Sequence, residues 1–224
     1  MMEINMDFWR FKGVIFDFDG TLADTLSMWS NIDDMFAKKH NITFSEDYPD
    51  QIAAMNFNQA AKFTKELFDL PMTVDEIIAE WYGYAIYEHT HNIYFKKGAV
   101  DFVRMLRKNG IKTAIASASE TDLILPALKN NGAENLFDAF AMTKEVKRGK
   151  GFPDVYDLAC KRLGLEPCEC VVFEDIVEAV KGAKMGGYVT VAVYDERSGK
   201  DKEKLTELAD LYIDSYEDLL TEGI

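Results

Sequence analysis

The sequence predicts a doubly wound α/β fold, built on a parallel sheet and carrying an inserted helical cap. Two observations predict the sheet: short, almost continuously apolar runs recur at wide intervals, and helical patterns lie between them. Unbroken apolar strands are typical of parallel sheets buried on both faces, and alternating strands and helices favour right-handed crossovers. A third observation, a long stretch without a buried strand, predicts the cap.

Four apolar runs have the length and composition of buried strands. They cover residues 13–16, 113–116, 170–173 and 188–193. A helical pattern from Val100 ends at Asn109 and Gly110, directly before the second run. Another helix begins at Pro153 and ends at Gly164, ahead of the third run. Strands and helices therefore alternate through the second half of the chain.

Residues 25–95 break this alternation. Helical patterns cover residues 28–40, 58–68 and 73–89, without a convincing buried strand between them. Because this block follows the first strand and precedes the second, it interrupts a single α/β unit, and we interpret it as a separate domain rather than an extension of the core. The predicted domains are an α/β core of residues 1–24 and 96–224 and a helical cap of residues 25–95.

Composition and charge restrict the possible partners. The chain has 224 residues, of which 48% are hydrophobic, and a formal net charge of −14. Such an acidic protein repels nucleic acids and anionic lipids, so we expect neither as a partner. No apolar run approaches the length of a membrane span. Three cysteines without a secretory leader indicate reduced thiols, and we expect a cytoplasmic location.

Polar groups follow the predicted strands at their carboxyl ends, where open α/β sheets bind ligands. Asp17 and Asp19 come directly after the first strand and are followed by Gly20. Both acids can point toward one site, and Gly20 lets backbone amides approach a ligand closely. After the second strand, Ser117 and Ala118 lead into a helix, where a hydroxyl and free amides form a phosphate cradle.

Two further features complete this set. Lys150 precedes a helix, and its ammonium is a compact charge suited to one phosphate oxygen. Glu174 and Asp175 end the third strand, and adjacent carboxylates suit a hard cation with oxygen ligands. Each feature alone is compatible with a turn, a helix cap or a solvated loop. Together they are chemically complementary and predict a metal-dependent phosphate-transfer enzyme.

The run Asp17-Phe18-Asp19-Gly20-Thr21-Leu22 resembles the most specific motif of the haloacid dehalogenase (HAD) superfamily. The likeness extends from Lys12 to the C-terminus and is greatest with the branch that includes β-phosphoglucomutase and small-metabolite phosphatases. Residues 98–119 also look like that branch, as does Glu174-Asp175 with the helix of small residues over 179–187. The resemblance implies a Rossmann-like core and Mg²⁺ as the cofactor.

The resemblance also implies a role for each reacting group. Asp17 attacks phosphorus and becomes an aspartyl phosphate. Asp19 protonates the leaving oxygen and then takes a proton from the incoming nucleophile, which agrees with the need for one acid/base in both halves of a covalent mechanism. Ser117, nearby amides such as that of Ala118, and Lys150 bind the transferring phosphoryl group.

The same resemblance implies the metal ligands. Asp175, with Glu174 directly or through water, completes a Mg²⁺ site alongside Asp17 and the carbonyl of Asp19. A cation is physically required there, because a carboxylate does not easily approach a phosphate dianion unscreened. One departure from the family pattern bears on this site: Ile176 stands where a polar residue is common, so we expect an outer hydrogen bond to be missing.

The choice among family reactions depends on a few residues. Dehalogenases lack the second acid, so Asp19 argues against them. A mutase resembling β-phosphoglucomutase has a histidine on the first cap helix and an arginine in the cap. Here Trp29 occupies the matching position, and residues 25–95 contain no arginine. We therefore favour a phosphatase acting on a small phosphorylated metabolite, with Trp29 influencing substrate choice.

Two alternatives stay open. The first is a sugar phosphomutase of the β-phosphoglucomutase type. The second belongs to another class: a non-catalytic phosphate-binding or scaffold protein on the same fold. The intact acid pair and Lys150 argue against the second alternative.

Overall fold

The computed structural model describes residues 6–52 and 57–221 of the chain, which forms two compact units. One unit comprises Met1–Leu26 and Ile93–Ile224, and the other Ser27–Asn92. Strands β2 (Ala23–Asp24) and β3 (Tyr94–Phe95) pair as a short antiparallel ribbon within the first unit. This pairing keeps the two segments that connect the units within the first unit. The second unit therefore begins after residue 25 and ends before residue 95, the predicted boundaries of the cap.

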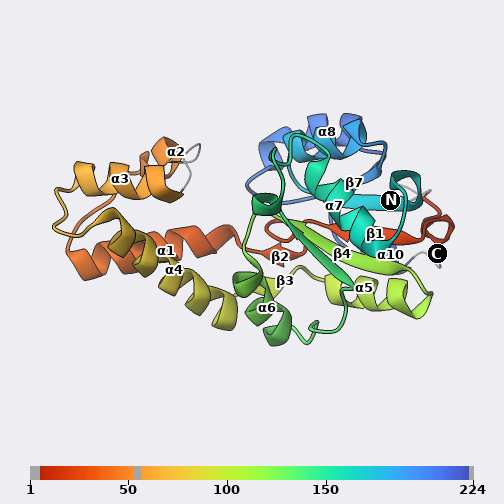
Figure 1. The fold of residues 1–224 in the computed structure, drawn as a ribbon, viewed down its shortest axis with the longest axis horizontal. Helices are drawn as coiled ribbons and strands as arrows, with labels where there is room; N and C mark the ends of the chain where they lie inside the picture. The colour runs from red at the N-terminus through yellow and green to blue at the C-terminus, as the bar shows by residue number, and fades with distance from the viewer. Residues whose placement is uncertain (1–5, 53–56, 222–224) are drawn as a thin grey trace. The chain divides into compact units, whose positions relative to one another are not determined.

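The first unit is built on a parallel sheet with strand order β5-β4-β1-β6-β7-β8 (Figure 1). The four predicted runs form β1 (Gly13–Phe16), β4 (Lys112–Ser117), β6 (Cys170–Glu174) and β7 (Val189–Val193). Two edge strands were not predicted: β5 (Ala139–Met142) and β8 (Leu211–Ile213). The predicted fold class, a doubly wound parallel sheet, is confirmed.

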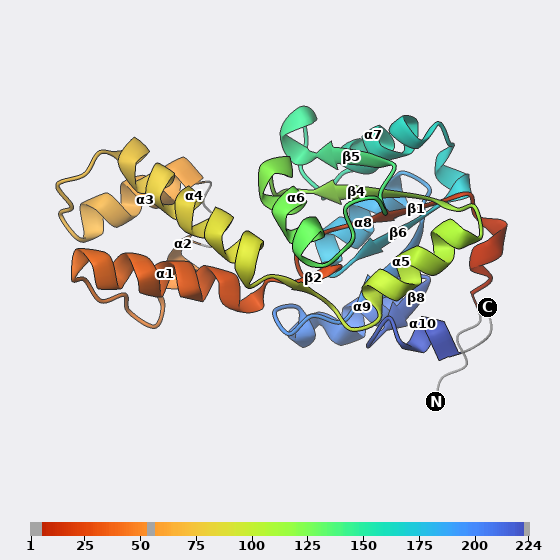
Figure 2. The ribbon, with the colours of Figure 1, turned by 90° about the horizontal axis from the view of Figure 1, so that it is seen from below.

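Helices cover both faces of the sheet (Figure 1 and Figure 2). Right-handed crossovers place α7 (Asp154–Leu163), α8 (Val177–Met185) and α9 (Lys202–Leu208) on one face. The other face carries α5 (Ala99–Lys108), α6 (Thr121–Asn130) and the short α10 (Asp218–Thr221), which packs against α5. Short 3₁₀ turns lie at η1 (Phe8–Arg10), η2 (Thr143–Glu145), η3 (Pro167–Glu169) and η4 (Gly199–Asp201).

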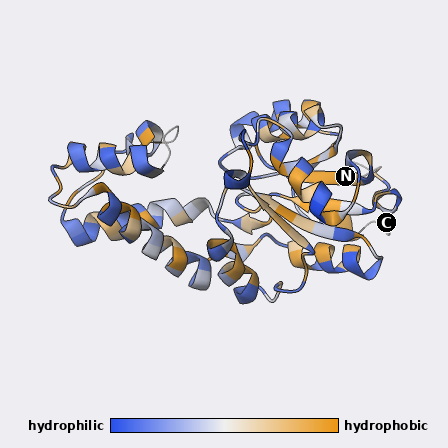
Figure 3. Cartoon of the chain, in the orientation of Figure 1, coloured by the Kyte–Doolittle hydropathy of each residue, from blue (hydrophilic) through white to orange (hydrophobic). Residues whose placement is uncertain are grey.

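Aromatic side chains fill the space under α5 and fix the carboxyl ends of the two central strands. Phe16 of β1 and Phe173 of β6 lie side by side, with ring centroids 4.8 Å apart. Tyr216 stacks on Phe173 at 5.8 Å, and its hydroxyl donates to the carbonyl of Thr21 at 3.3 Å. Because β1 and β6 are held in this register, the acids that follow them emerge next to each other. Figure 3 shows apolar residues concentrated on these strands.

The second unit is helical. It contains α1 (Leu26–His40), α3 (Phe57–Leu67) and α4 (Val74–His91), close to the predicted patterns, and a short α2 (Tyr48–Ile52) that was not predicted. A capping box begins α4: the Thr73 hydroxyl accepts from the backbone of Glu76, whose carboxylate accepts in return from the Thr73 amide. Within residues 6–52 and 57–221, no helix combines the length and apolar character needed to cross a bilayer.

Candidate active site

The loop after β1 places its polar side chains in a buried position. The amide of Asp17 donates to the carbonyl of Phe173 at 2.9 Å, which extends the β1–β6 pairing by one residue. The Asp17 side chain is therefore buried at the carboxyl end of the sheet. The buried Thr21 hydroxyl donates to Asp175 Oδ1 at 3.2 Å and lies 3.5 Å from Asp17 Oδ2. The apolar side chain of Ile176 is exposed and cannot donate a hydrogen bond to these acids, whereas the Thr21 hydroxyl does so.

Gly20 is required by both its backbone and its surroundings. Its φ of 80° is in the left-handed region, and its amide donates to the carbonyl of Ala23 at 2.9 Å. A Cβ at this position would collide with Arg197 Nη2 and lie 2.6 Å from Asp175 Oδ2. The Gly20 amide is therefore used inside the turn, and the missing side chain makes room for Arg197 and Asp175.

Lys150 joins two of the predicted acids. Its ammonium pairs with Asp17 Oδ1 and with Glu174 Oε1, the latter at 2.6 Å. The Tyr156 hydroxyl of α7 donates to the same Glu174 oxygen at 2.8 Å. Burial lowers the pKa of Lys150, but the charges of Asp17 and Glu174 outweigh burial and raise the pKa above its ordinary value. The two carboxylates therefore favour the charged form of Lys150.

The turn after β4 contacts Asp19. Ser117 is fully buried at the end of β4, and its Oγ accepts from the amide of Ser119 at 2.9 Å. The Ser119 hydroxyl donates to Asp19 Oδ2 at 2.6 Å, which orients the Asp19 carboxylate. The other Asp19 oxygen, Oδ1, is buried and has no hydrogen-bond partner in the described part of the chain. Asp19 is thus held on one side and unengaged on the other.

Three carboxylates form a possible metal site. Asp17, Glu174 and Asp175 each offer one oxygen, and these oxygens lie within 4.8 Å of one another. Burial, and then the charge of Asp17, raises the pKa of Glu174 to about 8 and that of Asp175 to about 7. Glu174 Oε2 is buried and has no partner among the described residues. Crowded acids and an unpaired buried oxygen fit a hard divalent cation.

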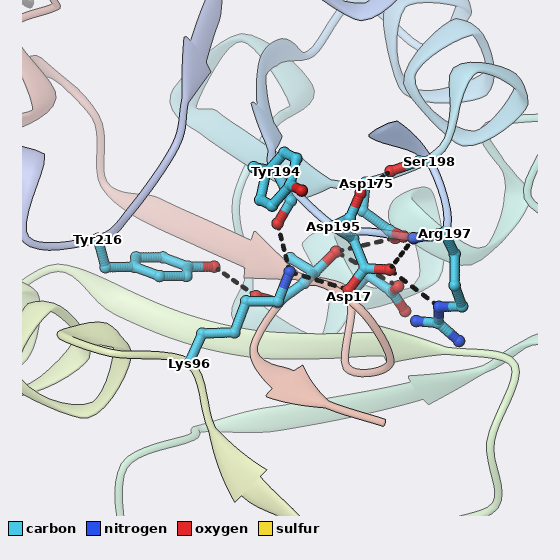
Figure 4. Close-up of polar contacts among 9 residues, drawn as sticks. Asp17, Lys96, Asp175, Tyr194, Asp195, Arg197, Ser198 and Tyr216 are labelled. Atoms are coloured by element: carbon cyan, nitrogen blue, oxygen red, sulfur yellow. Dashed lines mark hydrogen bonds and ion pairs between the residues drawn. The ribbon is translucent and has the colours of Figure 1, made fainter. Parts of the chain in front are cut away.

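Several of these groups line one pocket of about 440 Å³ within the first unit, whereas Ser117 and Glu174 are fully buried and do not line it. The lining includes Asp17, Asp19, Ala118, Lys150, Asp175 and Arg197. Residues predicted from three different strand ends therefore converge, together with Lys150 from the turn before α7. Arg197 comes from the segment after β7, where Figure 4 shows it bonded to Asp195.

Sequence reasoning missed several residues of this pocket. Thr21 lies inside the acid motif and was read as part of it, without a separate role. Ser119 and Tyr156 act through other side chains, and their sequence positions carry no separate signal. Arg197 was detectable, because it follows the fourth predicted strand at its carboxyl end.

A family model for haloacid dehalogenase-like hydrolases matches residues 11–187. The chain belongs to this family. The predicted HAD superfamily is therefore confirmed, and so is the predicted class of enzyme, a hydrolase. The candidate site residues lie at the carboxyl ends of the parallel strands of this HAD core.

The curated relatives of this chain include named phosphatases. Hexitol phosphatase A of Escherichia coli K12 is 31% identical over 216 residues and covers 94% of each chain. The protein named probable pseudouridine-5'-phosphatase of Drosophila melanogaster is 28% identical over 215 residues, covering 88% of this chain and 89% of that protein. Among solved structures, β-phosphoglucomutase from Clostridium difficile matches with a TM-score of 0.72 at 21% identity, covering 95% of this chain and 94% of that one. The structural match shows the fold alone.

Proposed function

We propose that this chain is a Mg²⁺-dependent phosphatase that hydrolyses a small phosphorylated metabolite through an aspartyl-phosphate intermediate. The observation that carries the proposal is the contact of Lys150 with both Asp17 and Glu174 in the pocket at the carboxyl end of the sheet. This contact joins a nucleophile, a phosphate-binding cation and a metal-binding acid. The names of the curated relatives, which include hexitol and pseudouridine-5' phosphatases, support the same reaction class.

The two acids of the loop have separate roles in the proposed mechanism. An Asp17 oxygen forms a bond to phosphorus while the bond from phosphorus to the leaving oxygen breaks, and Asp19 gives that oxygen a proton. In the second step Asp19 takes a proton from water, whose oxygen attacks phosphorus and releases Asp17. The unengaged Asp19 Oδ1, on a carboxylate oriented by Ser119, supports this assignment.

Phosphate is bound, in this proposal, by Lys150, the hydroxyl of Ser117 and the amide of Ala118. Lys150 is within reach of any group attached to Asp17, because it already pairs with that carboxylate. Ser117 accepts from Ser119 and keeps its hydroxyl proton for a phosphate oxygen. These groups stabilise charge on the oxygens of the transferring phosphoryl group.

Mg²⁺ would be held by Asp17, Asp175, the carbonyl of Asp19, and Glu174 directly or through water. The unpaired Glu174 Oε2 and the close approach of three acids support this donor set. When bound, the cation screens the repulsion between Asp17 and a phosphate dianion.

The metal requirement is tested with a phosphatase assay on hexitol phosphates, nucleoside 5'-phosphates and sugar phosphates. We expect release of inorganic phosphate to fall to background in excess EDTA and to return when Mg²⁺ is added in excess of the chelator. Undiminished turnover in excess chelator would contradict the proposal. Conversion of a sugar 1-phosphate to the 6-phosphate without release of phosphate would favour the phosphomutase, and no turnover of any ester would favour the non-catalytic alternative.

Substrate choice provides a separate prediction for the inserted unit, whose role as a cap stays a proposal. Trp29 lies on α1, and 41% of its surface is exposed, unlike a core residue. We expect Trp29→Ala to change the ratio of kcat/KM between two metabolite phosphates by about 10-fold. The rate with p-nitrophenyl phosphate should change much less. Leu67, also exposed and in the same unit, supplies the control Leu67→Ala. Unchanged substrate ratios in Trp29→Ala would show that Trp29 does not select the substrate.

A further inference from the structure

Arg197 enters the pocket from the segment that follows β7. Its Nε donates to Asp195 Oδ1 at 2.9 Å, and its amide donates to the same oxygen at 3.1 Å. Both bonds are made by the backbone amide and by Nε, the guanidinium nitrogen nearest the backbone. Within the described residues, the terminal nitrogens Nη1 and Nη2 have no hydrogen-bond partner. The free end of the guanidinium is therefore available to a ligand.

Asp195 is a buried anchor for this arginine. Its side chain is only 3% exposed, and its second oxygen pairs with Lys96 at 3.1 Å (Figure 4). Lys96 also donates to the carbonyl of Tyr194 and is itself mostly buried. Burial raises the pKa of Asp195, but Arg197 and Lys96 outweigh burial and hold that pKa below its ordinary value. The ionised Asp195 thus serves two cations, Lys96 and Arg197, and a single carboxylate does not balance both of their charges.

That remaining charge lies beside the reacting acids. Gly20 has no side chain, and a Cβ there would collide with Arg197 Nη2 and nearly touch Asp175 Oδ2. Arg197 therefore occupies the space next to the Gly20 backbone and the Asp175 carboxylate. It lines the same pocket as Asp17 and Lys150. Lys200, Glu178 and Asp201 also line this pocket. Unlike them, Arg197 is held by a buried carboxylate, that of Asp195.

The pocket needs a second cation to bind phosphate. A carboxylate that holds a metal ion must be ionised, so Asp17, Glu174 and Asp175 are all negative once a divalent cation is bound. Lys150 pairs with two of them, Asp17 and Glu174. A bound divalent cation and Lys150 together only balance these three carboxylates, which leaves no net positive charge for a phosphate dianion. Arg197 is positioned to offset that charge, because its guanidinium has free donors suited to phosphate oxygens.

We propose that Arg197 is a phosphate-binding residue of this active site, and that its free guanidinium end stabilises the bound phosphate dianion against the acids of the pocket. The inference rests on the proposed function and adds a residue to it. It has a distinctive consequence, because a cation beside metal-binding acids repels Mg²⁺ while it attracts phosphate. Losing the charge should therefore weaken the binding of phosphate without weakening the binding of Mg²⁺.

The test measures both ions on the purified protein by calorimetric titration. In Arg197→Gln we expect the Kd of inorganic phosphate, measured in saturating Mg²⁺, to rise about 10-fold, as for the loss of one partly exposed charge-assisted hydrogen bond. The Kd of Mg²⁺ alone should stay the same or fall. Arg197→Lys keeps the charge and should recover part of the phosphate affinity. Arg104→Gln removes an exposed arginine of α5, paired with Asp101, and should leave both constants unchanged.

The outcomes separate the possible roles. Weaker binding of both ions in Arg197→Gln would show that Arg197 only positions the acids, and would overturn the proposal. Unchanged phosphate affinity would overturn it as well. The proposed function fails in a different way, by absence of Mg²⁺-dependent phosphate release in the unmodified protein, so the two failures are distinguishable.

Discussion

Replacing Asp17 by asparagine should reduce turnover of every phosphate ester by ~10⁴-fold or more, as is typical when a covalent nucleophile is removed. The amide nitrogen and oxygen of asparagine do not form a stable acyl phosphate under these conditions, so the first step has no nucleophile. The substitution also removes one of the three clustered acids proposed to hold Mg²⁺. The measurement is kcat/KM for p-nitrophenyl phosphate and for the best metabolite substrate, both in saturating Mg²⁺.

Loss of activity in this variant must be separated from loss of the fold. Lys150 keeps its partner Glu174 at 2.6 Å when Asp17 is neutralised, so no buried charge is left unpaired. One of three mutually repelling carboxylates is also removed. We therefore expect an unchanged far-UV circular dichroism spectrum. Residual turnover within about 10-fold of the unmodified enzyme would show that Asp17 is not the nucleophile.

The central part of the fold could be predicted because its signals are local. Strands β1, β4, β6 and β7 are almost entirely buried, and their apolar runs are visible without knowledge of their partners. The edge strands β5 and β8 are apolar runs of four and three residues, and such short runs do not by themselves distinguish a strand from part of a helix. The β2–β3 ribbon pairs residues 23–24 with 94–95, and two-residue strands have no local pattern. Its existence depends on a contact across the whole inserted unit.

The residues of the candidate site also divide into those with a local sequence signal and those whose place depends on packing. The positions of Asp17, Asp19, Glu174 and Asp175 could be predicted because each lies at or just after the carboxyl end of a buried strand, where parallel strands end together. Supporting contacts could not be read from the sequence. Tyr156 contacts Glu174 because of the position of α7 on the sheet, which depends on packing.

At Gly20 the structure gives a reason for glycine that differs from the one read in the sequence. The sequence indicated a glycine that lets amides approach a ligand. The structure shows a left-handed turn whose amide is bonded to Ala23, with Arg197 and Asp175 where a side chain would be. Arg197 lies 177 residues after Gly20 along the chain, so no local sequence pattern connects the two residues.

Asp19→Asn should separate the two chemical steps, because the two acids of the loop act at different times. Asparagine keeps an oxygen that accepts from the Ser119 hydroxyl, so the orientation of the side chain is preserved. It has no acidic proton for the leaving oxygen and no basic oxygen for water. Loss of a positioned general acid/base costs roughly 10²–10⁴ in rate. Ordinary alkyl phosphates should therefore react slowly, and their first step should be impaired.

With p-nitrophenyl phosphate the same variant should release about one equivalent of nitrophenol and then stall. Nitrophenolate leaves readily without a proton, whereas water, with a pKa near ~15.7, still needs a base in the second step. The stalled species should carry phosphate on Asp17, detectable as added mass after a rapid acid quench. The unmodified enzyme, which turns over steadily, is the control. Steady turnover by the variant at the unmodified rate would refute the role of Asp19. A burst without added mass on the protein would refute Asp17 as the covalent nucleophile.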